Sequence, residues 1–284
     1  MAATAAPQST VGVATAPSTR RAPKRQQPWI ERLARKRGPG VLAFIAFIGI
    51  WQLLILVFDP SPLLFPGPAD VWDEWTKAVA DGSMWEATAN SMYAMSIGLA
   101  ISLVIGIPLG VAIGMSPTAD LITSPYLWGF FAMPRIALAP IMVLWLGFGA
   151  EIKIWLVVLS AIIPIILSAK DGVQTTDESL VRAARSFGAG RLQMFSKVVV
   201  PNTLPFIASG VRNGISRGFV GLLVIELTVG TGGIGTEVIR SSRDLDTARM
   251  FAFTATLIVL ALLLVSLSRR LEAYASRWRE EVVL

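Results

Sequence analysis

Several charged residues lie inside long apolar stretches of the sequence, where a charge is costly and usually has a function. Arg135 stands in one of these stretches and Glu226 in another. The planar guanidinium of arginine suits the oxygens of a carboxylate, sulfonate or nitrate. Arg135 and Glu226 are therefore candidates to line a path by which a small anion crosses a membrane. The structural alternative is that they neutralise each other, or that Arg212 or Arg217 pairs with the acid.

The composition excludes most enzyme chemistry. The 284 residues include no cysteine and no histidine, and glycine is never followed by lysine. Thiol nucleophiles, imidazole bases, thiolate or imidazole metal sites and a Walker A loop are thereby removed. We expect no catalytic site, no metal and no cofactor, so any energy from ATP must come from a partner protein.

Hydropathy indicates a polytopic membrane protein, since 54% of the residues are hydrophobic and the mean hydropathy is +0.62. We expect an all-α fold with six membrane-spanning helices at residues 41–58, 90–115, 126–146, 154–169, 206–229 and 251–267. They form a transmembrane domain from 41 to 268. Residues 1–40 pass from a disordered to an amphipathic segment, and residues 269–284 form a tail. Pro134 and Pro140 predict a bent or broken third span.

The distribution of basic residues predicts the orientation. If the N-terminus is inside, the cytoplasmic segments hold 17 Lys and Arg residues, Lys170 among them, and the external segments hold five, Lys153 among them. Basic residues are retained on the cytoplasmic side, so both termini should be cytoplasmic. The net charge of +6 then reflects attraction to anionic membrane lipid, and we expect no nucleic acid partner.

The second span carries small residues at four-residue intervals. The row consists of Ala94, Gly98, Ser102, Gly106, Gly110 and Gly114. Small side chains at this spacing let the backbone of another helix approach closely. We therefore expect this row to form a helix-packing seam.

A polar segment at residues 175–205 separates the fourth and fifth spans. Thr175 and Glu178 stand at capping-box spacing, which predicts a helix start, and Gly188 stands where a helix ends with positive φ. Apolar residues recur at helical spacing along this first helix: Leu180, Ala183, Ala184 and Phe187. A second helix should follow and stop at Pro201. The pattern predicts either a basic, amphipathic docking surface outside the bilayer or an ordinary pair of membrane-surface helices.

The spacing in this segment resembles the loop motif of ABC-importer permeases. That motif reads Glu-Ala-Ala, a glycine four residues after the second alanine, an aliphatic residue and Leu-Pro. The matching positions are Ala183, Ala184, Gly188, Val198 and Pro201. Arg182 replaces the family's glutamate and Val200 its leucine.

The family's loop is a coupling helix that seats in a groove of a cytoplasmic ATPase. The resemblance therefore implies an ATPase-coupling role for Leu180, Ala183, Ala184, Arg185, Phe187, Gly188 and Pro201. It also implies the fold of type I ABC-importer permeases in a bacterial inner membrane. The expected partners are two ATP-binding subunits, an external substrate-binding protein and a second copy of the permease.

Two further stretches resemble one branch of these permeases, which imports aliphatic sulfonates, taurine, nitrate and related solutes. The stretches are PRIALAP with LWLGFG, at 134–149, and LLVIELTVGTGGIG, at 222–235. The resemblance implies a small anionic cargo. An importer of an aromatic carboxylate or vitamin precursor, an ion-coupled secondary transporter and a channel remain as alternatives.

Overall fold

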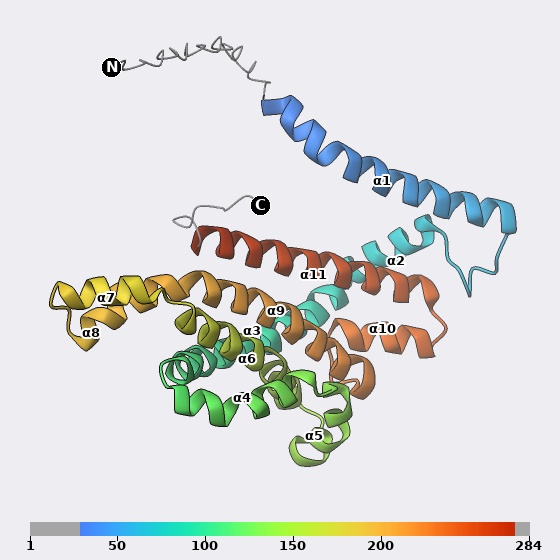
Figure 1. Cartoon of the computed structure of the whole chain (residues 1–284). Coiled ribbons are helices and arrows are strands. Elements are labelled where there is room, and N and C mark those ends of the chain that lie inside the picture. The colour runs from blue at the N-terminus through green and yellow to red at the C-terminus, as the bar shows by residue number, and fades with distance from the viewer. Residues whose placement is uncertain (1–28, 276–284) are drawn as a thin grey trace, which may run out of the picture. The chain divides into compact units, whose positions relative to one another are not determined.

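The computed structural model describes residues 29–275, which form helices and the loops between them (Figure 1). The helices are α1 (Trp29–Phe58), α2 (Pro68–Ala80), α3 (Ser83–Gly114), α4 (Pro117–Ala132), η1 (Arg135–Leu138), α5 (Ala139–Leu146), α6 (Ala150–Gln174), α7 (Glu178–Ser186), α8 (Arg191–Met194), η2 (Phe195–Val199), α9 (Val200–Val229), α10 (Ile234–Arg243) and α11 (Thr247–Ala275). The part of the N-terminal segment for which disorder is predicted, residues 1–28, and the end of the predicted tail, 276–284, lie outside the described residues.

The chain divides into two units, Met1–Ile50 and Trp51–Leu284. The first contains most of α1, which begins at Trp29 and continues through Pro39 into the apolar part of the helix. The predicted boundary at residue 41 therefore falls inside a continuous helix. The second unit contains all other described helices and every candidate site.

Four helical stretches of the described chain are long and apolar enough to cross a membrane: Ser83–Gly114, Ala150–Gln174, Arg191–Arg243 and Thr247–Ala275. The third predicted span is a broken pair, Pro117–Ala132 and Arg135–Leu146, bent by 89°. Met133 and Pro134 have extended backbones at the break, as a proline after a helix favours. Leu42–Phe58 is a shorter apolar helix. The count of six spans stays a prediction.

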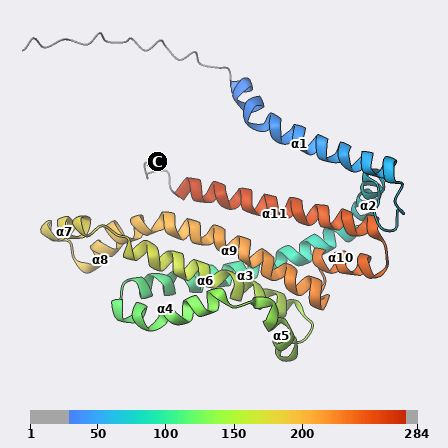
Figure 2. The same ribbon diagram turned by 45° about the vertical axis from the view of Figure 1, so that its right-hand side comes forward.

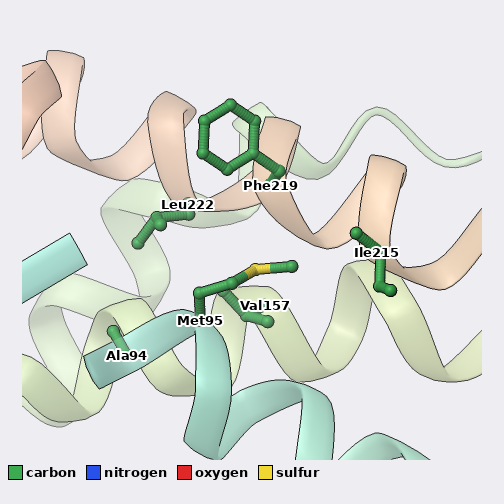
Figure 3. Packing of buried hydrophobic residues seen from close by; sticks show 6 residues of the cluster. All are labelled: Ala94, Met95, Val157, Ile215, Phe219 and Leu222. Carbon is green, nitrogen blue, oxygen red and sulfur yellow. The ribbon is translucent and has the colours of Figure 1, made fainter. Parts of the chain in front are cut away.

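Helix α6 is the most buried element of the second unit and packs against both α3 and α9 (Figure 1, Figure 2). Met95 of α3, Val157 of α6 and Phe219 of α9 meet in one buried apolar cluster (Figure 3). The core of the unit is therefore a three-helix layer that holds the remaining elements in place.

The small-residue row of α3 lies against α6. A Cβ added at Gly98 would lie 2.7 Å from the Val157 Cβ, and one at Gly110 would lie 2.5 Å from the Ile166 carbonyl oxygen. A second row, missed by the sequence analysis, lines α9: Gly210, Gly214, Gly218 and Gly221 all face α6. Their spacing of four, four and three residues is the sequence signal by which this row could have been predicted. Small residues on both neighbours allow α6 to approach two helix backbones at once.

Pro201 does not stop a helix, contrary to the prediction. The backbone passes from α8 through the π-helical turn Phe195–Val199 and into α9, where Pro201 occupies the first turn. A proline in the first turn of a helix costs little stability, because an N–H at that position has no hydrogen-bond partner within the helix. The wider π-turn before it supplies the geometry that joins the two helices.

Candidate functional site

Helix α7 presents apolar side chains away from the rest of the chain. Leu180 is 53% exposed, Phe187 is 92% exposed and Leu192, on the following α8, is 79% exposed. Ala183 and Arg185 are also exposed and Ala184 is half-buried. Both views show α7 and α8 lying beyond the ends of α6 and α9 (Figure 1, Figure 2). Leu180, Ala183, Ala184 and Phe187 share one face at helical spacing, and we name this face, bordered by Arg185, the α7 surface.

The two ends of α7 are built by local polar contacts. The predicted Thr175–Glu178 capping box does not form, because Thr175 ends α6 and donates its hydroxyl to the Asp171 carbonyl oxygen. Asp177 caps α7 instead, and its carboxylate accepts from the Ser179 amide at 2.7 Å. That hydrogen bond holds the pKa of Asp177 below its usual value.

The far end of α7 is closed by Gly188, whose φ is +76°. Left-handed backbone of this kind favours glycine, so the residue suits the sharp reversal between α7 and α8. Pro201 is exposed and lies well beyond this turn, in the first turn of α9. Arg182 forms an ion pair with Glu178 at 3.0 Å. Thus, where the family's motif has an acid, this chain has a cation with a partner in its own helix.

Glu226 is fully buried and has partners on several elements, although Arg135 is not one of them. Its carboxylate accepts from the Ser91 hydroxyl at 2.7 Å and from the Gly235 amide at 3.0 Å. The Lys153 ammonium lies 3.9 Å from the same carboxylate and donates to the Gly232 carbonyl oxygen at 3.1 Å. We name this group, with Ser91, the Glu226 cluster.

The Glu226 cluster joins α3, α6 and α9 to the start of α10. Ser91 also accepts from the Ile234 amide at 3.0 Å, so two amides at the start of α10 are satisfied by buried side chains. The sequence analysis placed Lys153 in an external loop. It is in fact a buried residue of α6. Lys170, which the sequence analysis counted with the cytoplasmic segments, is also buried in α6 and pairs with Asp120 at 2.9 Å.

Arg135 lies at the break in the third span, and Arg217 of α9 lies beside the same break. The Arg217 guanidinium carbon lies 4.1 Å from the centre of the Phe131 ring, and the Arg135 Nη2 donates to the Phe131 carbonyl oxygen at 3.5 Å. Arg212, the other suggested partner for the acid, pairs with Glu272 at 3.3 Å. The structure therefore brings Arg135 together with Arg217 and leaves Glu226 in a separate cluster.

Comparison with known proteins agrees with this architecture. Residues 102–279 match the sequence model described as "Binding-protein-dependent transport system inner membrane component". The chain resembles the methionine ABC transporter MetNI in its inward-facing form, with a TM-score of 0.54 and 21% identity over 68% of this chain and 94% of that one. At that level of identity the likeness establishes the fold alone.

Curated relatives are similar over most of their length. The taurine transport system permease protein TauC of Escherichia coli is 30% identical, covering 91% of this chain and 96% of that protein. A putative aliphatic sulfonates transport permease protein, SsuC of the same organism, is 30% identical over 84% and 88%. The riboflavin transport system permease protein RibX of Chloroflexus aurantiacus is 29% identical over 89% and 96%.

Proposed function

Because this chain belongs to the inner membrane components of binding-protein-dependent transport systems, a family of ABC-importer permeases, we propose that its cargo is a small sulfonate such as taurine. The observation that carries the proposal is the 30% identity to TauC over nearly the whole of both chains. The two arginines at the break in the third span support it, since guanidinium groups bind the oxygens of such anions well.

The α7 surface is the proposed seat of the ATP-hydrolysing partner. Burial of large apolar side chains such as Phe187 against a partner lowers the free energy of the complex. Helix α7 is too polar and too short to span a membrane, so this face is available to a partner outside the bilayer. Leu180, Ala183, Ala184 and Phe187 would enter the partner's groove, Arg185 would border it, and Gly188 with Pro201 would fix the shape of the loop.

The proposed assembly is a permease homodimer with two ATP-binding subunits and an external binding protein. In this arrangement both termini and the α7 surface face the cytoplasm, as the Lys and Arg distribution favours. The exposed apolar residues of α4 and α5, such as Leu144 at 83% exposure, would contact lipid or the second copy. ATP hydrolysis would take place in the partner subunits.

Reconstituted transport tests the cargo. The complete transporter, with its ATP-binding subunits and binding protein, is placed in liposomes, and ATP-dependent uptake of radiolabelled taurine and ethanesulfonate is measured. A transporter carrying Ala184→Leu serves as the uncoupled control. Uptake of either sulfonate in the parent but not in this variant supports the proposal.

The relative RibX favours a second cargo, riboflavin, and the same liposomes decide between the two. ATP-dependent uptake of riboflavin without uptake of either sulfonate would overturn the sulfonate assignment. The membership of the family would be unaffected by that result.

A further inference from the structure

Arg135 and Arg217 share one neighbour, Phe131, although 82 positions separate them in the sequence. Arg217 lies over the face of the ring and Arg135 over the carbonyl oxygen of the same residue. The aromatic face attracts a cation, so Phe131 holds one guanidinium while its backbone orients the other. The break after Ala132 brings Arg135 into this position, because a straight helix would have carried it onward along the span.

The two guanidinium groups carry charge that the described chain does not balance. Within residues 29–275, neither lies within 4.0 Å of a carboxylate oxygen, whereas Lys153, Lys170 and Arg212 each do. Arg135 also has a buried Nε with no hydrogen-bond partner. Both groups contact Phe131 and both are cations, so they repel each other.

Their position makes this imbalance costly. Arg217 lies 12 residues before Val229, the last residue of α9, which corresponds to a depth of about 18 Å at the helical rise per residue. An unpaired charge at such depth is unfavourable unless it meets water or a counter-ion. No acid of residues 29–275 forms an ion pair with either guanidinium, so the missing counter-charge should come from outside this part of the chain.

We propose that Arg135 and Arg217 form a binding site for the sulfonate group of the cargo, with Phe131 as the aromatic wall between them. The inference rests on the proposed function and deepens it, because it assigns the anionic end of the cargo to two named side chains. Each guanidinium presents several N–H donors in a plane, and a sulfonate has three oxygens to receive them. Arg217 thus becomes a specificity-determining residue that the sequence analysis considered only as a partner for Glu226.

The absence of cysteine from the chain allows a direct test. Arg217→Cys introduces the chain's one thiol, which is treated in the assembled transporter with two thiol reagents that share the same reactive thiosulfonate group. One is methyl methanethiosulfonate, which is neutral; the other is 2-sulfonatoethyl methanethiosulfonate, which carries an ethanesulfonate group. The thiolate attacks the reagent's S–S bond, forms a mixed disulfide and releases methanesulfinate.

The ratio of the sulfonated to the neutral reaction rate measures anion preference at the site. If Arg135 faces the same space, its charge should raise this ratio about tenfold, and adding Arg135→Gln should remove the gain. Arg243→Cys on α10, an exposed position, is the matched control. Its ratio should be unchanged by Arg135→Gln.

Three results would overturn the proposal: a ratio that Arg135→Gln does not lower, a thiol that neither reagent reaches, or a transporter that cannot assemble with either Arg217→Cys or the reciprocal Arg135→Cys. The last would assign the arginines to structure. The labelling does not depend on which solute is transported. A riboflavin importer with strong anion preference would refute the proposed cargo alone, and a sulfonate importer without that preference would refute the site alone.

Discussion

The seam between α3 and α6 predicts that adding one carbon atom at Gly110 destabilises the protein. A Cβ at this position would lie 2.5 Å from the Ile166 carbonyl oxygen and 2.7 Å from the Ala169 Cβ. Ordinary contacts between carbon atoms are about 3.5–4.0 Å, so the helices would have to separate locally by roughly 1 Å. The nearest obstacle is backbone, which cannot rotate away as a side chain can.

The magnitude follows from two opposed terms. Overpacking of a well-packed core costs about 1–3 kcal/mol, while replacing glycine by alanine in a helix gains about 1 kcal/mol. Gly110→Ala should therefore lower the free energy of unfolding by up to about 2 kcal/mol. Gly129→Ala in α4 is the matched control, because a Cβ there meets nothing within 4 Å. Gly129→Ala should therefore raise the free energy of unfolding by about 1 kcal/mol, the gain in helix propensity alone.

Gly106 provides an intermediate case. A Cβ at this position would meet side-chain atoms first, at 3.1 Å from a methyl of Ile165, and side chains can adjust. Unfolding of the purified permease, followed by circular dichroism as the mole fraction of sodium dodecyl sulfate is raised, should rank stability as Gly129→Ala, then Gly106→Ala, then Gly110→Ala. Equal stability of Gly110→Ala and Gly129→Ala would refute the close approach of α3 and α6.

Three further predictions concern the other sites. Ala184→Leu or Gly188→Val should abolish ATP-driven uptake while the permease still inserts in the membrane, because the changes alter only the α7 surface or strain its closing turn. Val181→Leu, a conservative change on the same helix at a position outside the α7 surface, is the control. Lys153→Met should destabilise the permease by about 3–5 kcal/mol, since it removes the charge partner of a buried acid, and adding Glu226→Gln should recover part of the loss. Asp177→Ala should speed hydrogen exchange of the α7 amides, because the helix loses its cap. The pKa of Asp177 is lowered in the folded protein. The stability that the ionised cap gives to α7 is therefore complete above the usual pKa of about 3.9, and it is lost as pH falls through the lowered pKa.

Each has a clear contrary result. Normal coupled uptake by both α7 variants would reject the docking role, and a double variant no more stable than Lys153→Met would reject the charge pairing in the Glu226 cluster. Unchanged exchange rates in Asp177→Ala at neutral pH would reject its role as the cap.

Sequence patterns determined the features that depend on neighbours along the chain. The apolar stretches, the four-residue row on α3, the break at Pro134 and the positive φ of Gly188 all follow from local sterics and hydropathy, and the structure shows each of them. The same patterns were misleading where two local solutions competed. Thr175 and Asp177 can both cap a helix, and Pro201 can either end one helix or begin the next.

Only the tertiary structure decided which charges meet. Glu226 could pair with any cation near its depth, and no spacing in the sequence distinguished Lys153, 73 positions away, from Arg135, Arg212 or Arg217. The choice depends on how α6 fits between the glycine rows of α3 and α9, which sets the depth and rotation of every side chain on these helices. Partners distant in sequence are selected by that packing, because a charge in an apolar layer is stabilised only by groups within a few ångströms of it.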